Sequence, residues 1–134
     1  MKEIRKMSHH AIVHLELSAS DLDETKEFYH ELFGWKVKPV KGADYEVFQP
    51  SRGPGGAFIQ VGSAGMKPGE IRVYIESDDV AANLEKVEEL GGKVIIPETI
   101  VPGVGIIGVF TDPTGNKLTL IHFQLDPENQ GPVF

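Results

Sequence analysis

The chain has 134 residues, a formal net charge of −7 and no cysteine. A chain of this length forms one domain, or two small modules that share a core. The lack of cysteine excludes disulfides, thiolate metal sites and a cysteine nucleophile. The negative net charge argues against a nucleic-acid partner, since binding to the phosphate backbone depends on Lys and Arg. No apolar run approaches the roughly 20 residues of a membrane span, so we expect a soluble, cytoplasmic protein with no membrane partner.

The first expected element is a strand over residues 11–19, where apolar and polar residues alternate. This period of two is typical of a half-buried strand with one apolar face. The apolar face carries Val13, Leu15 and Leu17, and the other face carries His14 and Glu16. A histidine on the polar face is predicted to lie away from the helix-packed core.

The segment SDLDETKEFYHELFGW then changes to helical spacing. Ser20 or Asp21 can cap the start of this helix, and Gly34 is placed to end it in a left-handed conformation. The expected apolar stripe comprises Leu22, Phe28, Tyr29, Leu32 and Phe33, and we interpret these aromatic residues, with Trp35, as core. Three short strands are predicted over residues 35–41, 44–49 and 57–62, with a turn at PSRGPGG before the last of them.

The pattern repeats after SAGMKPG, a segment that we interpret as a linker. Asp78 and Gly91 each lie 57 positions after Asp21 and Gly34, and further strands are expected over residues 93–101, 105–111 and 117–123. The predicted fold is therefore α+β, with two tandem βαβββ modules in one domain over residues 1–134. The modules span about residues 9–64 and 70–123, and an arm follows over residues 124–134.

Each module is too small to bury both faces of its own sheet, so the two are expected to pack together. With the helices on the outer faces, the polar strand faces would line a cleft. These faces carry His14 and Glu16 in the first module and Arg72, Tyr74 and Glu76 in the second.

The motifs FYHELFGW, LGGKV and DPTGNKLTL, together with the repeat, resemble the vicinal oxygen chelate superfamily over about residues 9–123. This superfamily includes glyoxalase I, bleomycin-resistance proteins, fosfomycin-resistance enzymes and extradiol dioxygenases. The resemblance implies paired βαβββ modules with mixed sheets that curl around a cleft, and it implies a homodimer.

Metal-dependent members of that superfamily hold a divalent cation, and their four ligand positions fall here on His14, Gln60, Arg72 and Thr119. Arginine cannot ligate a metal because it stays cationic and has no lone pair to give. We therefore predict no cofactor, and His14 and Gln60 are the ligands if a divalent metal does bind. An error of one residue in strand register would change which side chains face inward, so Glu16, Glu76 and His122 stay open as alternatives.

The expected function is the binding of a small, possibly anionic molecule in the cleft through a metal-free site, as in the bleomycin-resistance members. The cleft residues are predicted to be His14, Glu16, Phe58, Gln60, Arg72, Tyr74 and Thr119, with Trp35 as a further apolar wall. Arg72 would pair with a carboxylate or phosphate. No catalytic residue is assigned.

Three alternatives remain open from the sequence. In the first, the chain would be a metal-dependent lyase, isomerase or dioxygenase that uses His14 as one ligand. In the second, it would be an interaction protein with no ligand. In the plainest interpretation of the residues themselves, His14 is an ordinary hydrogen-bonded histidine on a strand surface, and Arg72 makes an ion pair with Glu16 or Glu76 across the sheet.

Overall fold

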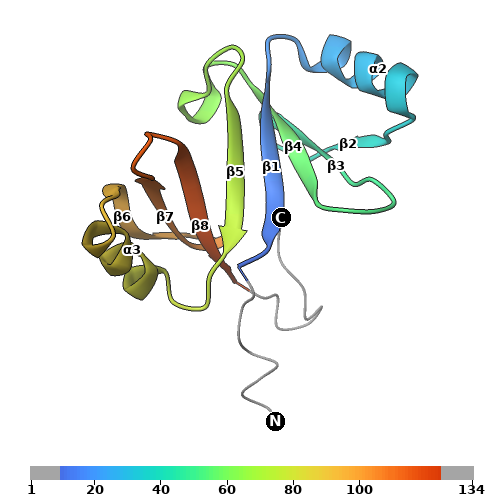
Figure 1. Ribbon diagram of the computed structural model, residues 1–134. Coiled ribbons are helices and arrows are strands. Elements are labelled where there is room, and N and C mark those ends of the chain that lie inside the picture. The colour runs from blue at the N-terminus through green and yellow to red at the C-terminus, as the bar shows by residue number, and fades with distance from the viewer. Residues whose placement is uncertain (1–9, 125–134) are drawn as a thin grey trace. The chain divides into compact units, whose positions relative to one another are not determined.

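A computed structural model describes residues 10–124 of the chain, which divide into two compact units (Figure 1). The first unit contains residues 13–73, and the second contains residues 74–124 together with residues 10–12. The predicted C-terminal arm, from residue 125 onward, lies outside the described residues. Neither helix in the described part of the chain is both long enough and apolar enough to cross a membrane.

The main elements of the first unit are one α-helix and four strands. In chain order these are β1 (Ile12–Ala19), α2 (Leu22–Phe33), β2 (Val37–Pro39), β3 (Tyr45–Phe48) and β4 (Gly55–Gln60). The strand order is β2-β3-β4-β1, in which β1 and β4 are parallel and the other pairs are antiparallel.

The second unit repeats this series. Its elements are β5 (Ile71–Glu76), whose first residues still belong to the first unit, α3 (Val80–Glu89), β6 (Lys93–Val101), β7 (Gly105–Thr111) and β8 (Lys117–Phe123). The strand order is β5-β8-β7-β6, with β5 and β8 parallel. The α+β class and the two successive βαβββ series are confirmed.

Both helix starts are capped by aspartate. The Glu24 backbone N–H donates to Asp21 at 3.0 Å, and Gly34 ends α2 with φ of 74°. In α3 the cap is Asp79, which accepts from the Ala82 N–H at 3.0 Å, whereas the 57-residue offset aligns Asp21 with Asp78. The repeat therefore shifts by one residue at this cap.

The start of β4 depends on two glycines. β4 begins at Gly55, two residues before the predicted strand, and Gly56 lies directly against β1. A Cβ atom on Gly56 would be 2.0 Å from the Leu15 carbonyl oxygen. Because no side chain fits in that space, glycine is required for the close parallel pairing of β1 and β4.

The core of the first unit lies beneath α2 and is largely aromatic. Phe58 is only 1% exposed and stacks on Tyr29 with ring centres 5.1 Å apart. Trp35 stacks on Phe48 at 4.6 Å, and Phe48 in turn contacts Phe58 at 4.8 Å. Trp35 and Phe58 therefore belong to this core, and the prediction that they form walls of a cleft is wrong.

The apolar stripe of α2 is only partly buried. Leu22 and Tyr29 pack on the sheet, whereas Phe28, Leu32 and Phe33 are all more than half exposed. Leu22 and Tyr29 are seven positions apart and so lie on one side of the helix. The prediction that Phe28 and Phe33 are core residues is wrong, because both are 58% exposed, although the Phe33 ring still contacts Tyr29 and Trp35.

The segment predicted as a linker is folded onto the first unit. It forms a short 3-10 helix, η1 (Ser63–Gly65), and Met66 just after it is buried against Ala57 and Ile59. Tyr45 and Val47 pack around the same cluster. By strand alternation this second cluster lies on the face of the sheet opposite to Phe58, and Met66 therefore covers part of the face that carries no helix.

In the second unit, β6 is the last strand in the order and is irregular. Its pairing with β7 shifts register twice, between Val94 and Ile96 and between Ile96 and Thr99. Ile100 is 73% exposed, and Ile95 is also exposed. The main core of this unit lies under α3, where Val80, Leu84 and Leu120 pack with Ile75 and others.

The DPTGN segment is a tight turn between β7 and β8, as predicted. Asp112 accepts hydrogen bonds from the backbone N–H groups of Thr114, Gly115 and Asn116 at 2.9–3.0 Å, and from the Asn116 side-chain amide at 2.9 Å. The Asn116 side chain is the main cause of a lowered pKa of the Asp112 carboxyl group, and the backbone N–H groups add to this effect.

We predict that Phe58→Ala lowers the free energy of unfolding by about 3–5 kcal/mol, because it opens a cavity in the aromatic core. Phe28→Ala is the matched control, since Phe28 lies in the same unit and is 58% exposed. The control should cost less than about 1 kcal/mol. Urea unfolding followed by circular dichroism measures both values, and equal losses would contradict the placement of Phe58 in the core.

We also predict that Asp112→Ala lowers the melting temperature at neutral pH, while Thr114→Ala, whose side chain makes none of these bonds, has little effect. A carboxyl group with a lowered pKa in the folded state stabilises the protein above its ordinary value of 3.8, and this contribution is lost as the pH falls through the lower folded value. Thermal unfolding across pH should therefore show the gap between wild type and Asp112→Ala closing below pH 3.8. A gap that stays constant down to strong acid would contradict this account.

Candidate functional site

A histidine and a glutamate lie side by side on the face of β1 that carries no helix. His14 is 7% exposed and Glu16 is 9% exposed, and His14 Nε2 is 3.4 Å from Glu16 Oε2. Residues two apart on a strand share a face, so the backbone of β1 itself places the two side chains together. Charged groups are rarely buried to this degree unless they have a structural partner or a function.

The neighbours of this pair on β4 are small. His14 is the register partner of Gly55, and Glu16 is the register partner of Ala57. The amide of Gln49 lies over Gly55, since a Cβ there would be 2.3 Å from Gln49 Oε1. The two ionisable side chains thus lie on a mostly apolar face with small neighbours, and Gln49 is a polar residue near this surface that the sequence analysis missed.

Two predicted cleft residues lie on the opposite face. Phe58 is the register partner of Leu17, and Gln60 is the register partner of Ala19, and both partners face α2. The Gln60 side-chain Nε2 donates to the Ser20 carbonyl at 2.8 Å, so its amide supports the loop before α2. The predictions that Phe58 and Gln60 share a surface with His14 are wrong, because the side chains of these two β4 residues point to the helix side of the sheet.

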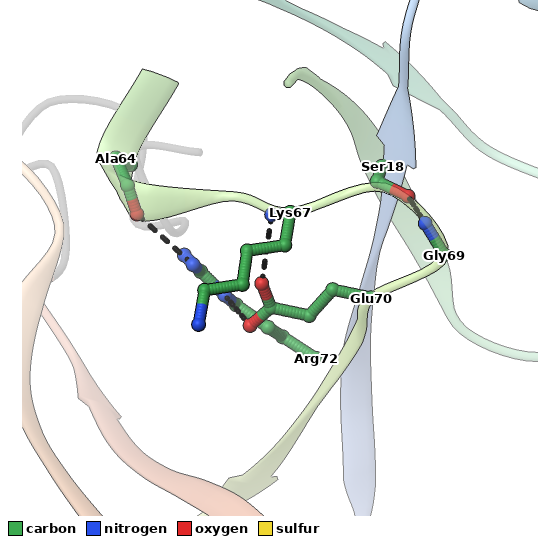
Figure 2. A network of polar contacts seen from close by, with 6 residues as sticks. All are labelled: Ser18, Ala64, Lys67, Gly69, Glu70 and Arg72. Carbon is green, nitrogen blue, oxygen red and sulfur yellow. Dashed lines mark hydrogen bonds and ion pairs between the residues drawn. The ribbon is translucent and has the colours of Figure 1, made fainter. Parts of the chain in front are cut away.

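Arg72 is held within a polar network that we call the Glu70–Arg72 clasp, formed by Ser18, Ala64, Lys67, Gly69, Glu70 and Arg72 (Figure 2). Arg72 Nε donates to Glu70 Oε2 at 2.9 Å, and Arg72 Nη2 donates to the Ala64 carbonyl at 2.9 Å. The other Glu70 oxygen accepts the Lys67 backbone N–H at 3.0 Å. Figure 2 shows the Arg72 guanidinium pointing to these groups.

The clasp also fixes the chain after η1. The Gly69 backbone N–H donates to Ser18 Oγ at 2.9 Å, and Ala64 adopts a left-handed conformation with φ of 51°. Alanine rarely adopts this conformation, so the surrounding contacts must hold it there. Arg72 Nη2 bonds the Ala64 carbonyl and is one such contact.

Two roles for Arg72 were open from the sequence, an anion contact or an ion pair with Glu16 or Glu76. The structure has an ion pair, but the partner is Glu70. Glu70 and Arg72 are two residues apart around the start of β5, which places opposite charges on one side of an extended chain. This spacing was the signal in the sequence, and it was overlooked because only Glu16 and Glu76 were considered as partners of Arg72.

The remaining predicted residues belong to the second unit. Tyr74 on β5 and Thr119 on β8 are register partners, and Thr119 is buried. His122 lies on the other face of β8, as expected from its spacing from Thr119, and its Nδ1 lies 3.0 Å from the Ser77 carbonyl oxygen. The second unit thus brings Tyr74 and Thr119 together, and places His122 away from them.

The four positions that correspond to the metal ligands of the family do not fit a divalent cation. Gln60 lies on the wrong face of its sheet, and Arg72 is a cation whose donors are already bonded. Thr119 would supply a single hydroxyl, and His14 one imidazole nitrogen. Within residues 10–124, no three His, Asp or Glu side chains are grouped as a metal site would require.

The first unit also has a groove on its helix side, with a volume of about 510 Å³. It is lined by Asp23, Lys26, Glu27, His30, Trp35, Lys36 and Val37. His30 Nδ1 lies 3.0 Å from the Trp35 carbonyl oxygen, which fits a structural role at the end of α2. This groove is separated from His14 and Glu16 by the sheet.

Comparison with known proteins places this geometry in a family. The family model described as Glyoxalase/Bleomycin resistance protein/Dioxygenase superfamily matches residues 11–120. A putative glyoxylase of Mycobacterium bovis, CFP32, is 34% identical over 115 residues, which are 79% of this chain and 43% of that protein. The chain therefore spans less than half the length of this relative.

A glyoxylase-like domain-containing protein of Didymella fabae is 32% identical over 116 residues, covering 81% of this chain and 90% of that protein. The crystal structure of a glyoxalase/bleomycin resistance protein/dioxygenase superfamily member from Vibrio splendidus matches with a TM-score of 0.62 at 14% identity, over 84% of this chain and 97% of that one. The fold predicted from the FYHELFGW, LGGKV and DPTGNKLTL motifs is confirmed. This chain belongs to the glyoxalase/bleomycin resistance protein/dioxygenase superfamily.

Proposed function

We propose that the protein binds a small organic molecule at the helix-free face of β1, through His14 and Glu16 and without a metal ion. The observation that carries the proposal is the buried pair itself, whose ring nitrogen and carboxylate oxygen are 3.4 Å apart. A histidine can donate or accept a hydrogen bond and a carboxylate accepts several, so the pair offers a small ligand fixed polar contacts on an otherwise apolar surface.

Two further observations support a binding role. Relatives described as glyoxylases support a site for a small molecule, although the whole CFP32 protein is more than twice as long as its match to this chain. The neighbours of the pair along the same face of β4, Ala57 and Ile59, are apolar, and small-molecule sites combine a few polar groups with apolar neighbours. Tyr74 and Thr119, expected to contact the ligand from the second unit, and the homodimer implied by the family both stay predictions.

The donor set supports a site that works without a metal. With Gln60 on the opposite face and Arg72 bonded to Glu70, His14 and Glu16 are the two metal-ligating groups placed side by side on this face of β1. Two ligands from one strand give little affinity for a transition metal, because tight sites use three or four protein donors in a defined geometry. The proposed site therefore works through hydrogen bonds and apolar contact.

We predict that the protein, dialysed separately against Zn²⁺, Ni²⁺, Mn²⁺ and Fe²⁺ and then against buffer, retains well under one metal per chain by elemental analysis. Any residual metal should be the same in wild type, His14→Ala and the control His30→Ala, which removes an exposed histidine of α2. One metal per chain that is lost in His14→Ala and kept in His30→Ala would contradict the metal-free site.

We also predict that benzyl alcohol, used as a probe with a hydroxyl group and an apolar ring, binds weakly at this face. In ¹H–¹⁵N correlation spectra, the titration should shift the backbone amides of His14, Glu16 and Ala57 most strongly. His14→Ala should weaken binding roughly tenfold, the effect of losing one hydrogen bond, and His30→Ala should not. Shifts confined to Trp35 and Lys36 would instead place the probe in the groove beside α2.

A further inference from the structure

We infer that residues 62–69 form a strap that closes the proposed binding face, and that Met66 occupies the place of the ligand's apolar part until a ligand displaces it. This inference rests on the proposed function and adds the step that opens the site. It is carried by three observations on the first unit, namely the position of Met66, the contacts that hold the strap, and the conformation of Ala64.

Met66 lies over the apolar residues next to Glu16. It is 2% exposed and packs against Ala57 and Ile59. Ala57 is the register partner of Glu16 in the parallel pairing of β1 and β4, so the two side chains are neighbours on the helix-free face. A ligand that contacts His14 and Glu16 therefore finds the neighbouring apolar surface already occupied by Met66.

The strap is anchored to this face by a single buried side chain. Met66 is buried, whereas Gly65 and Lys67 on either side of it are exposed. A segment with so little buried apolar surface opens more readily than an element that buries a whole face. Gly62 and Gly69, near its two ends, have φ of 95° and 79°, and glycine can change φ freely, as a hinge requires.

The Glu70–Arg72 clasp holds the strap closed (Figure 2). Arg72 Nη2 donates to the Ala64 carbonyl oxygen within the strap, and Arg72 Nε donates to Glu70 Oε2, both at 2.9 Å. Ala64 itself has φ of 51°, a conformation that costs free energy in a residue other than glycine and that opening would relieve. Met66 burial and the clasp thus favour the closed strap, and the strain at Ala64 favours the open one.

This arrangement links ligand binding to the opening of the strap. Because only the open form accepts the apolar part of a ligand, the apparent dissociation constant is the intrinsic one divided by the open fraction. Peroxide reaches the Met66 sulfur only in the open form, so the rate of its oxidation to the sulfoxide is proportional to the same fraction. A change that loosens the strap must therefore raise the affinity and the oxidation rate by the same factor.

The first test uses the wild-type full chain at pH 7 with hydrogen peroxide, which transfers one oxygen atom to the sulfur and leaves as water. Oxidation of Met66 is followed by peptide mass spectrometry. Benzyl alcohol, at a concentration that saturates the shifts of the His14 and Glu16 amides, should raise the oxidation rate at least about tenfold, because it holds the strap open. Free methionine in the same solutions corrects for any effect on the peroxide itself.

The second test loosens the clasp. Arg72→Ala removes the bond to the Ala64 carbonyl and should raise both the oxidation rate of Met66 without ligand and the affinity for benzyl alcohol, by factors that agree within about twofold. The matched control is Arg52→Ala, which removes an exposed arginine between β3 and β4 and should change neither value. Arg72→Lys, which keeps the positive charge, provides the same comparison if Arg72→Ala does not fold.

An oxidation rate that stays the same or falls while benzyl alcohol shifts the His14 and Glu16 amides would overturn the inference and leave the proposed site standing. Faster oxidation in Arg72→Ala without tighter binding would also overturn it, since the strap would then open independently of the site. If benzyl alcohol shifts neither amide, the proposed function fails and the inference fails with it. The wild-type rates decide the matter even if no variant folds.

Discussion

The parallel pairing of β1 with β4 is the constraint on which the first unit depends. Gly56 allows the two backbones to approach, and the resulting register sets Leu17 beside Phe58 and Glu16 beside Ala57. Every second residue then belongs to the aromatic core under α2, and the residues between them belong to the helix-free face. One register therefore decides both what stabilises the unit and what the face can offer to a ligand.

The polar residues of this unit divide into two kinds. Those of the Glu70–Arg72 clasp satisfy one another and hold the chain after η1 in place, so their charges are used within the fold. His14 and Glu16 instead lie on a regular strand, which needs neither side chain for its backbone pairing. A buried ionisable pair on a regular strand is the feature that marks this face as a candidate binding surface.

Much of the fold could be predicted from the sequence, because period-two and helical spacing, the Asp21 cap, Gly34 and the DPTGN turn each have a local physical cause. The position of the second cap at Asp79 could not be predicted, since it depends on a shift of one residue within the repeat.

The candidate site was predicted in part. His14 and Glu16 follow from alternation along one strand, whereas the faces of Phe58 and Gln60 depend on the register between strands that are distant in sequence. The partner of Arg72 was missed because only glutamates across the sheet were considered and not Glu70, two residues before it. The Gly- and Pro-containing segment before Glu70 was taken for a linker, although it packs on the unit through Met66.

The irregular pairing of β6 has a consequence for how the protein behaves in concentrated solution. A strand at the end of a sheet can recruit the strand of another molecule, and exposed isoleucines make such growth favourable. In β6 the two register shifts, the second of which contains Pro97, break the row of backbone donors and acceptors that an incoming strand would have to match. The protein can thus keep Ile95 and Ile100 at its surface without presenting an uninterrupted template for aggregation.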